Sequence, residues 1–157
     1  MPPPTPRGLP AFRQPSDKRS SNMRAIRSDS NATTEQRLRA HLIRNRIANW
    51  KVRVKDVHGC PDFFFPIERI AIFVDGCFWH GCPKCGRTPK TNRPYWSKKL
   101  ARNKQRDAQT TRNLRSRGTR VLRLWECQLR DNPSSCLRRL LTMLERAPAP
   151  ATGNHAV

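Results

Sequence analysis

The stretch from Phe73 to Cys85, FVDGCFWHGCPKC, places the strongest constraint on the fold of this chain. It gathers an acid, a histidine, two adjacent large aromatic residues and three cysteines within thirteen positions. It continues an apolar, β-branched run that starts at Ile70 and is typical of a buried strand. The reactive groups are therefore expected where a strand leaves its sheet, a common place for a functional site.

The cysteines of this stretch follow the pattern C-x4-C-x2-C, and the C-x2-C half has the spacing that lets two thiolates reach one tetrahedral ion. The best fourth ligand is in LWEC, at the end of a second apolar strand. The pattern predicts a structural zinc site that joins two strand ends. Its four ligands would be Cys77, Cys82, Cys85 and Cys127. Cys60 is either a spare thiol or a replacement for one of these ligands, and Cys136, among leucines, is expected to be a buried free thiol.

The charge of the chain indicates a polyanionic partner. Lys and Arg outnumber Asp and Glu by 32 to 11, which gives a formal net charge of +21 and a pI near 11.5. The basic residues are spread along the whole chain and no apolar run approaches the ~20 residues of a spanning helix, so nucleic acid is favoured over a membrane. We see no secretion signal, so the cysteines are expected to be reduced, in a cytoplasm, and to bind metal rather than form disulfides.

Composition divides the chain into three parts. Residues 1–17 are rich in proline and are expected to form a disordered arm, and residues 147–157 are an Ala/Pro-rich segment expected to be a disordered tail. Residues 18–146 are expected to form one domain with a core of modest size. A monomer is the default expectation for its oligomeric state.

Hydrophobic periodicity predicts an α/β domain with a mixed sheet flanked by helices. A capping-box pattern opens the first helix at Thr33, and Gly118 ends the second. Ser97 is the expected cap of that second helix, and Ser134 or Ser135 the expected cap of the last. The predicted helices are 33–46, 97–117 and one that starts near 135, and the predicted strands are 50–55, 62–65, 69–74 and 119–127.

Asp62 is the leading candidate for a catalytic residue. It opens the middle strand of a predicted three-stranded meander, and Asp75 ends the next strand, so a hairpin-like return could bring both acids to the same end of the sheet. Two carboxylates there could hold one or two Mg²⁺ ions against a phosphate. A single Asp beside proline more often caps its own turn. The coincidence of Asp62 with Asp75 and His80 favours the site.

Other candidates have simpler explanations when the residues alone are considered. Glu35 lies in the first turn of a helix, where the helix dipole already favours a carboxylate. Met23 is more simply explained as a residue that docks on the core. The pair Phe78–Trp79 would ordinarily be core, but it lies between two candidate zinc ligands of a very basic protein, which favours an exposed and rigid position.

Several motifs in order resemble the very short patch repair (Vsr) endonuclease family, over roughly residues 18 to 144. They read NMRAI, EQRL, GCPDF, FVDGCFWHGCP, YW, NKQRD and VLRLWEC. The resemblance implies a restriction-endonuclease-like core with a structural zinc ion. It also implies a Mg²⁺-dependent enzyme that nicks duplex DNA on the 5′ side of the T in T:G mispairs, which arise when 5-methylcytosine is deaminated.

The resemblance also implies roles for individual residues. Asp62 matches the catalytic aspartate, which would bind Mg²⁺ together with a backbone carbonyl near Val74. His80 matches a general base or water-positioning histidine, and Glu35 matches a supporting acid. Asp75 occupies a variable position of the same site. The four cysteines named above fall where the family binds zinc.

The DNA-contacting residues of the family can be placed in the same way. Phe78, Trp79 and Trp96 match aromatic residues that insert into the duplex beside the mispair from the major groove. Met23 matches a residue wedged in from the minor-groove side, and Arg24 next to it is a further DNA-binding candidate.

The expected partner is double-stranded DNA with a T:G mispair, in a bacterial cytoplasm and associated with the nucleoid. Mismatch-repair proteins and a companion cytosine-5 methyltransferase system are further expected partners. Two other functions fit the residues. A non-catalytic, zinc-stapled DNA-binding module would make Mg²⁺ and Asp62 irrelevant, and a small basic RNA-binding protein of ribosomal type would show no preference for mispaired duplex.

Overall fold

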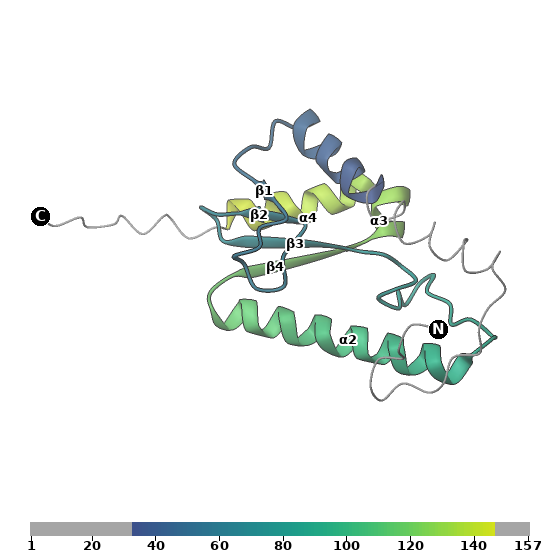
Figure 1. The fold of residues 1–157 in the computed structure, drawn as a ribbon. Coiled ribbons are helices and arrows are strands. Elements are labelled where there is room, and N and C mark those ends of the chain that lie inside the picture. The colour runs from purple at the N-terminus through teal and green to yellow at the C-terminus, as the bar shows by residue number, and fades with distance from the viewer. Residues whose placement is uncertain (1–32, 147–157) are drawn as a thin grey trace, which may run out of the picture.

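A computed structural model describes residues 33–146, which form a four-stranded mixed sheet with helices on both faces (Figure 1). The strand order is β1-β2-β3-β4; β2 runs antiparallel to β1 and β3, and β3 runs parallel to β4. This confirms the predicted α/β class and mixed sheet. In chain order the elements are a helix at 33–44, β1 (Lys51–Val52), β2 (Phe63–Phe65), β3 (Ile70–Asp75), α2 (Arg93–Ser116), β4 (Arg120–Trp125), α3 (Glu126–Asp131) and α4 (Pro133–Glu145).

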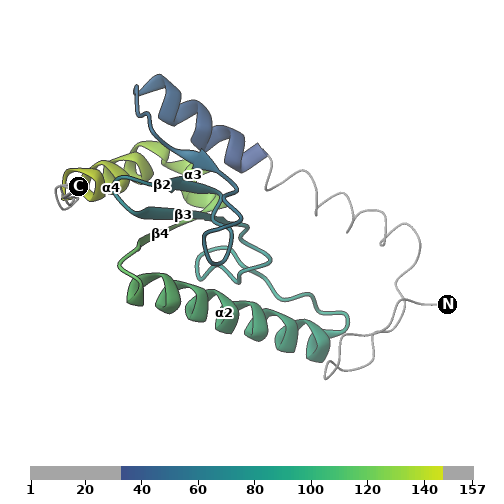
Figure 2. The ribbon, with the colours of Figure 1, turned by 60° about the vertical axis from the view of Figure 1, so that its left-hand side comes forward.

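The two faces of the sheet carry separate cores because side chains alternate along β3. Ile70, Ile72 and Val74 point into the larger core, which the helix at 33–44, α3 and α4 cover. Ala71 and Phe73 point to the other face, where they pack with Leu114 of α2. Figure 2 shows α2 alone beneath the sheet and the other helices above it. Asp75 belongs to the second set by this alternation, so its side chain is directed to the α2 face.

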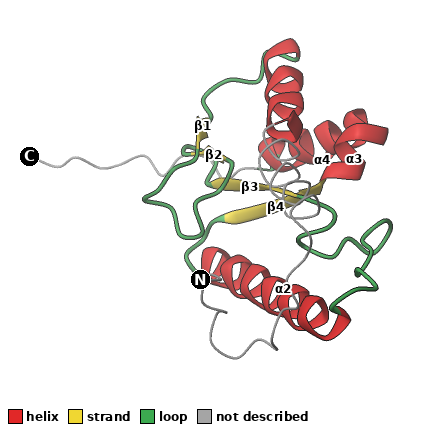
Figure 3. Cartoon of the chain, turned by 45° about the vertical axis from the view of Figure 1, so that its right-hand side comes forward, coloured by secondary structure: helices red, strands yellow, loops and turns green. Residues whose placement is uncertain are grey.

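The first strand is shorter than predicted. Its alternating pattern predicted a strand over 50–55, but only Lys51–Val52 is paired with β2. Arg53 adopts a left-handed backbone conformation with φ 47°, which turns the chain away from the sheet edge. Figure 3 shows the long loop that follows, between β1 and β2.

The second helix begins before the predicted Ser97 cap. α2 starts at Arg93, after Asn92 in the left-handed conformation, and Pro94 occupies the first turn, where its missing N–H costs nothing. The end of the helix is confirmed: Gly118 has φ 74°, which glycine adopts without steric cost.

The C-terminal part contains a short helix that the periodicity did not predict. Cys127 lies in this helix, α3, and not at the end of a strand. The cap predicted at Ser134 or Ser135 is in fact Asn132, whose side chain accepts a hydrogen bond from the backbone N–H of Ser135. Asparagine is a strong N-cap, and Pro133 behind it suits the first helical position.

Some expectations lie outside the described residues. These are the disordered arm at 1–17, the disordered tail at 147–157, and the DNA-binding candidates Met23 and Arg24. Within residues 33–146, none of the helices is both long enough and apolar enough to cross a membrane.

Candidate active site and cysteine cluster

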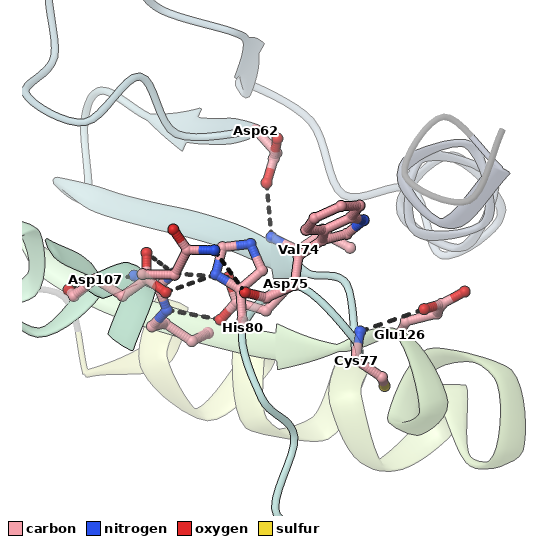
Figure 4. Close-up of polar contacts among 10 residues, drawn as sticks. Asp62, Val74, Asp75, Cys77, His80, Asp107 and Glu126 are labelled. Atoms are coloured by element: carbon pink, nitrogen blue, oxygen red, sulfur yellow. Dashed lines mark hydrogen bonds and ion pairs between the residues drawn. The ribbon is translucent and has the colours of Figure 1, made fainter. Parts of the chain in front are cut away.

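Asp62 directly precedes β2, and its carboxylate accepts a hydrogen bond from the backbone N–H of Val74 on β3, at 2.6 Å (Figure 4). Burial raises the pKa of this carboxyl group to about 6; the Val74 N–H opposes the rise, and the charge of Glu35 adds to it. The sheet therefore holds a partly buried acid beside the end of β3. Such perturbed acids are concentrated at functional sites.

Glu35 lies in the first turn of the helix at 33–44, close to Asp62. Its side chain is 18% exposed and forms an ion pair with Arg53, whose Nη2 lies 3.0 Å from Glu35 Oε2. Both the charge of Glu35 and a side-chain hydrogen bond raise the pKa of Asp62, so the two carboxyl groups are close neighbours. The structure thus brings Glu35 and Asp62 together.

Asp75 makes its strongest contacts elsewhere. It forms a bidentate pair with Arg123 of β4, with the guanidinium Nε and Nη2 each 2.6 Å from a carboxylate oxygen. Its Oδ1 also lies 3.7 Å from Nδ1 of His80. In Figure 4 Asp75 and His80 lie on the opposite side of β3 from Asp62. The structure therefore groups Asp75 with His80 and Arg123, on the α2 side.

His80 is oriented by a carboxylate from α2. Its Nδ1 lies 2.5 Å from Oδ2 of Asp107, and Arg123 Nη2 lies 3.2 Å from the other oxygen of Asp107. Burial would raise the pKa of Asp107, but His80 and Arg123 outweigh it and hold that pKa below its usual value. A carboxylate on Nδ1 fixes the ring and leaves Nε2 as the nitrogen that can exchange a proton with a substrate or water.

Sequence reasoning assigned no role to Asp107 or Arg123. Asp107 is nevertheless the only acid in the sequence of α2, a helix otherwise rich in Lys and Arg. Arg123 interrupts the apolar run of β4. An isolated acid in a basic helix, and a base inside a buried strand, are the two signals that could have revealed this network.

Asp107→Asn is expected to lower the rate of the DNA cleavage that the family resemblance implies by at least about 10²-fold, because the amide no longer favours the productive ring orientation of His80. Single-turnover cleavage would measure the rate, and thermal unfolding would verify the fold. Asp131→Asn is the matched control, since Asp131 pairs with Arg130 on the surface. Equal rates for Asp107→Asn and the control would refute the orienting role of Asp107.

The predicted zinc ligands form one cluster. The Sγ atoms of Cys77, Cys82, Cys85 and Cys127 all lie within 4.8 Å of one another. Sulfur atoms about 2.3 Å from a tetrahedral zinc ion would be about 3.8 Å apart, and the Cys82 and Cys127 Sγ atoms are 3.8 Å apart. The four cysteines and the spacing of their sulfur atoms fit one metal ion bound by four thiolates. Cys60 is exposed and outside the cluster, and Cys136 is buried in the core, as predicted.

Backbone groups prepare this cluster for a metal ion. The N–H of Cys127 points to Sγ of Cys77 at 3.3 Å, and Glu126 accepts the N–H of Cys77, also at 3.3 Å. Burial raises the pKa of Cys82, but N–H groups of Cys85 and Lys84 outweigh it and lower that pKa to about 7. Burial raises the pKa values of Cys77 and Cys127. Ion binding is therefore expected to release protons from these thiols.

Four aromatic rings, those of Phe78, Trp79, Tyr95 and Trp96, pack together beside the cysteine cluster. Phe78 contacts Trp79 and Trp96, with ring centroids 4.9 and 5.3 Å apart, and Tyr95 contacts Trp96 at 5.4 Å. The ammonium group of Lys99 lies between 5.3 and 5.6 Å from the ring centroids of Trp79, Tyr95 and Trp96. Phe78 and Trp79 are partly exposed, whereas Trp96 is only 6% exposed. Trp96 thus supports the two rings that reach the surface.

A partly buried acid at the start of a strand, a histidine oriented by a carboxylate and a strongly basic chain are together typical of a nuclease. The family model described as "DNA mismatch endonuclease Vsr" matches residues 14–86. The DNA mismatch endonuclease Vsr of Escherichia coli is 39% identical over 129 residues, which cover 81% of each chain. The chain belongs to the Vsr family of DNA mismatch endonucleases, and it is a DNA endonuclease.

Two further relatives are described as type II nicking enzymes. V.NaeI of Lentzea aerocolonigenes is 44% identical over 112 residues, which cover 69% of this chain and 67% of the relative. V.XorIIP of Xanthomonas oryzae is 37% identical over 117 residues, which cover 73% and 84% of the two chains.

Proposed function

We propose that this endonuclease nicks one strand of duplex DNA on the 5′ side of the T in T:G mispairs that arise from deaminated 5-methylcytosine. The observation that carries the proposal is the presence of the Asp62–Glu35 pair and the Asp107–His80 dyad on the two sides of the end of β3. The likeness to a DNA mismatch endonuclease over most of both chains supports the mispair as substrate. The sheet, with a catalytic acid entering β2, supports a restriction-endonuclease-like core.

The donor set around Asp62 fits a magnesium site. Mg²⁺ in phosphate-processing sites prefers one or two carboxylates plus oxygens of the substrate. Asp62 would hold the ion, with the backbone carbonyl of Val74 as second protein ligand and Glu35 in support. Strand residues direct N–H and C=O to the same neighbouring strand, and the Val74 N–H already faces Asp62. When bound, Mg²⁺ supplies positive charge that stabilises the attacked phosphate and the leaving oxygen.

His80 is the proposed general base. With Nδ1 held by Asp107, its Nε2 can take a proton from the attacking water. Asp75 and Arg123 hold Asp107 and His80 from the sheet side, which limits rotation of the ring. In this scheme Asp75 is a positioning residue. A structural zinc ion on the four cysteines would fix the loop that carries His80.

Phe78 and Trp79 are the proposed wedge beside the mispair, and Trp96 supports the two rings from below. Met23 and Arg24 are proposed as DNA contacts from the N-terminal side. Partial unstacking of a base step costs a few kcal/mol, and a T:G wobble pair is easier to open than a Watson–Crick pair. The rings already stand together before DNA arrives, and Asn103 donates to the Trp79 carbonyl at 2.9 Å. Preorganisation of this kind lowers the cost of binding.

Trp79→Ala is expected to weaken binding of a T:G duplex by about 10- to 100-fold, since one stacked ring contributes about 1–3 kcal/mol. Binding of a T:A duplex should fall less, because the ring inserts poorly into paired DNA. Fluorescence anisotropy with both duplexes would measure the ratio. Ile67→Ala is the control, as Ile67 is an exposed apolar side chain on the β2–β3 turn, away from the aromatic rings. Parallel losses for both duplexes would contradict the wedge.

The test of the proposed function is nicking of matched duplexes that contain T:G, T:A or C:G in several cytosine-methylation contexts, with Mg²⁺ and with EDTA. A Mg²⁺-dependent cut of one strand, 5′ of the T and confined to T:G, is expected. The cutting context would identify the companion methyltransferase site. Tight binding without any cut would instead support the non-catalytic DNA-binding module. We further propose that the enzyme acts as a monomer whose catalytic domain is formed by residues 18–146. Its proposed location is the nucleoid of a bacterial cytoplasm, and mismatch-repair proteins are its proposed partners.

A further inference from the structure

Arg53 occupies an unusual place beside the candidate magnesium site. It follows directly on β1, and its backbone N–H donates to the carbonyl oxygen of Asp62 at 3.2 Å, so the two residues face each other across the strands. Its φ of 47° is a left-handed conformation that costs a non-glycine residue of the order of 1 kcal/mol. Strained residues of this kind are concentrated at functional sites.

The side chain of Arg53 spans from the sheet edge to the helix at 33–44. Its Nη2 lies 3.0 Å from Oε2 of Glu35, so one guanidinium neutralises the carboxylate that faces Asp62. The pair is unequal in burial: the Arg53 side chain is 67% exposed, and that of Glu35 is 18% exposed. The guanidinium therefore covers a carboxylate pair from the solvent side.

An exposed ion pair of this type is weak and is easily exchanged. A divalent cation held by Asp62, with Glu35 beside it, would place a second positive charge near the guanidinium and repel it. Arg53 could leave at little desolvation cost because most of its side chain already faces water. A released guanidinium carries five donors in a planar fork, which matches the oxygens of a phosphate.

We propose that Arg53 is an exchangeable counter-ion of the active site, which neutralises Glu35 and Asp62 until a divalent cation displaces it, and which then binds a backbone phosphate of the DNA next to the cleaved bond. The inference rests on the proposed function for its phosphate partner. The movement of Arg53 from the carboxylates to the phosphate would make cation binding and DNA binding cooperative. Arg53 is thus a positioning residue that links the two ligands.

The first test titrates Mn²⁺ into the zinc-loaded protein without DNA, by calorimetry. Arg53→Gln removes the competing charge and is expected to bind Mn²⁺ about 3- to 10-fold more tightly than the wild type. Arg44→Gln is the control: it changes the net charge equally but lies nine residues beyond Glu35, about 14 Å along the helix axis. Arg53→Lys keeps a counter-ion and should bind Mn²⁺ with nearly wild-type affinity.

The second test measures DNA affinity with Ca²⁺ and with EDTA. Ca²⁺ should tighten duplex binding by the wild type about 10-fold more than binding by Arg53→Gln. Unchanged or weaker Mn²⁺ binding by Arg53→Gln would overturn the counter-ion role. Equal Ca²⁺ effects on both proteins would overturn the phosphate role. The Mn²⁺ titration needs neither DNA nor cleavage, so its outcome is independent of whether the enzyme prefers T:G.

Discussion

Asp62→Asn is expected to lower nicking by at least about 10³-fold while the folded protein becomes more stable at neutral pH. The rate falls because the amide is a poor Mg²⁺ ligand, and several kcal/mol of charge stabilisation correspond to three or more decades in rate. Stability rises because the variant no longer buries an ionised group beside Glu35. Single-turnover nicking of a T:G duplex and denaturant unfolding would measure the two effects.

The stability effect has a defined pH dependence. The pKa of Asp62 rises from its ordinary value of 3.8 to about 6 in the folded protein. The folded state therefore binds the proton more tightly, and this contribution to stability is complete below pH 4 and is lost as the pH rises through 6. Without metal, Asp62→Asn should be about 1–3 kcal/mol more stable than the wild type at pH 8, and the difference should shrink towards pH 4.

Magnesium should reverse the comparison, because a ligand that binds only the folded wild type stabilises it. Added Mg²⁺ is expected to raise the unfolding midpoint of the wild type and to leave that of Asp62→Asn unchanged. Asp131→Asn, on the surface, serves as the control and should respond to Mg²⁺ as the wild type does. An equal Mg²⁺ response in Asp62→Asn would exclude Asp62 as the principal ligand.

The local parts of this fold could be predicted from the sequence. The triple Phe63–Phe65 and the run Ile70–Asp75 became β2 and β3, since short apolar runs bounded by turn residues have few alternatives. The cysteine spacing was equally informative, because C-x2-C encodes the geometry of a metal-binding turn within a few residues. Gly118 ended α2 for the same local reason, a left-handed φ.

The contacts that complete the site could not be predicted, because they join segments far apart in the chain. The dyad of His80 and Asp107 depends on how a 24-residue helix lies along the sheet, and no local pattern encodes that register. Asp62 and Asp75 lie on different sides of β3, because Asp62 accepts the Val74 N–H whereas Asp75 pairs with Arg123. The strand order predicted that both acids reach one end of the sheet, but it did not indicate these separate partners. Arg53 shortened β1 through a backbone conformation that its residue type does not signal.

Cys127→Ser is expected to remove the bound zinc and to leave the protein largely unfolded at 37 °C. A structural zinc ion contributes an apparent 10–16 kcal/mol in small zinc domains, about as much as the whole stability of an average domain, ~5–15 kcal/mol. Here the ion would join the loop after β3 to the first turn of α3, two segments that hydrogen bonds of Cys77 with Glu126 and Cys127 also connect. Zinc content by mass spectrometry and thermal unfolding would measure both losses.

Substitutions of two other cysteines serve as controls, because they remove a thiol without removing a zinc ligand. Cys60→Ser changes an exposed thiol outside the cluster and should leave zinc content and unfolding unchanged. Cys136→Ser places a hydroxyl in the core and should lower stability without loss of zinc, since Cys136 packs among the leucines of α4. Full zinc content and an unchanged midpoint in Cys127→Ser would show that Cys127 is not a ligand.

The loss of zinc is also expected to disturb the position of His80, because this residue lies between two of the ligands, Cys77 and Cys82, in the same loop. Without the ion, this loop would depend on the Asp107 contact and on a few backbone hydrogen bonds. A chelator is therefore expected to abolish nicking, and the activity should not return when Mg²⁺ alone is restored. Recovery on addition of Mg²⁺ without Zn²⁺ would mean that the cysteine cluster does not position His80.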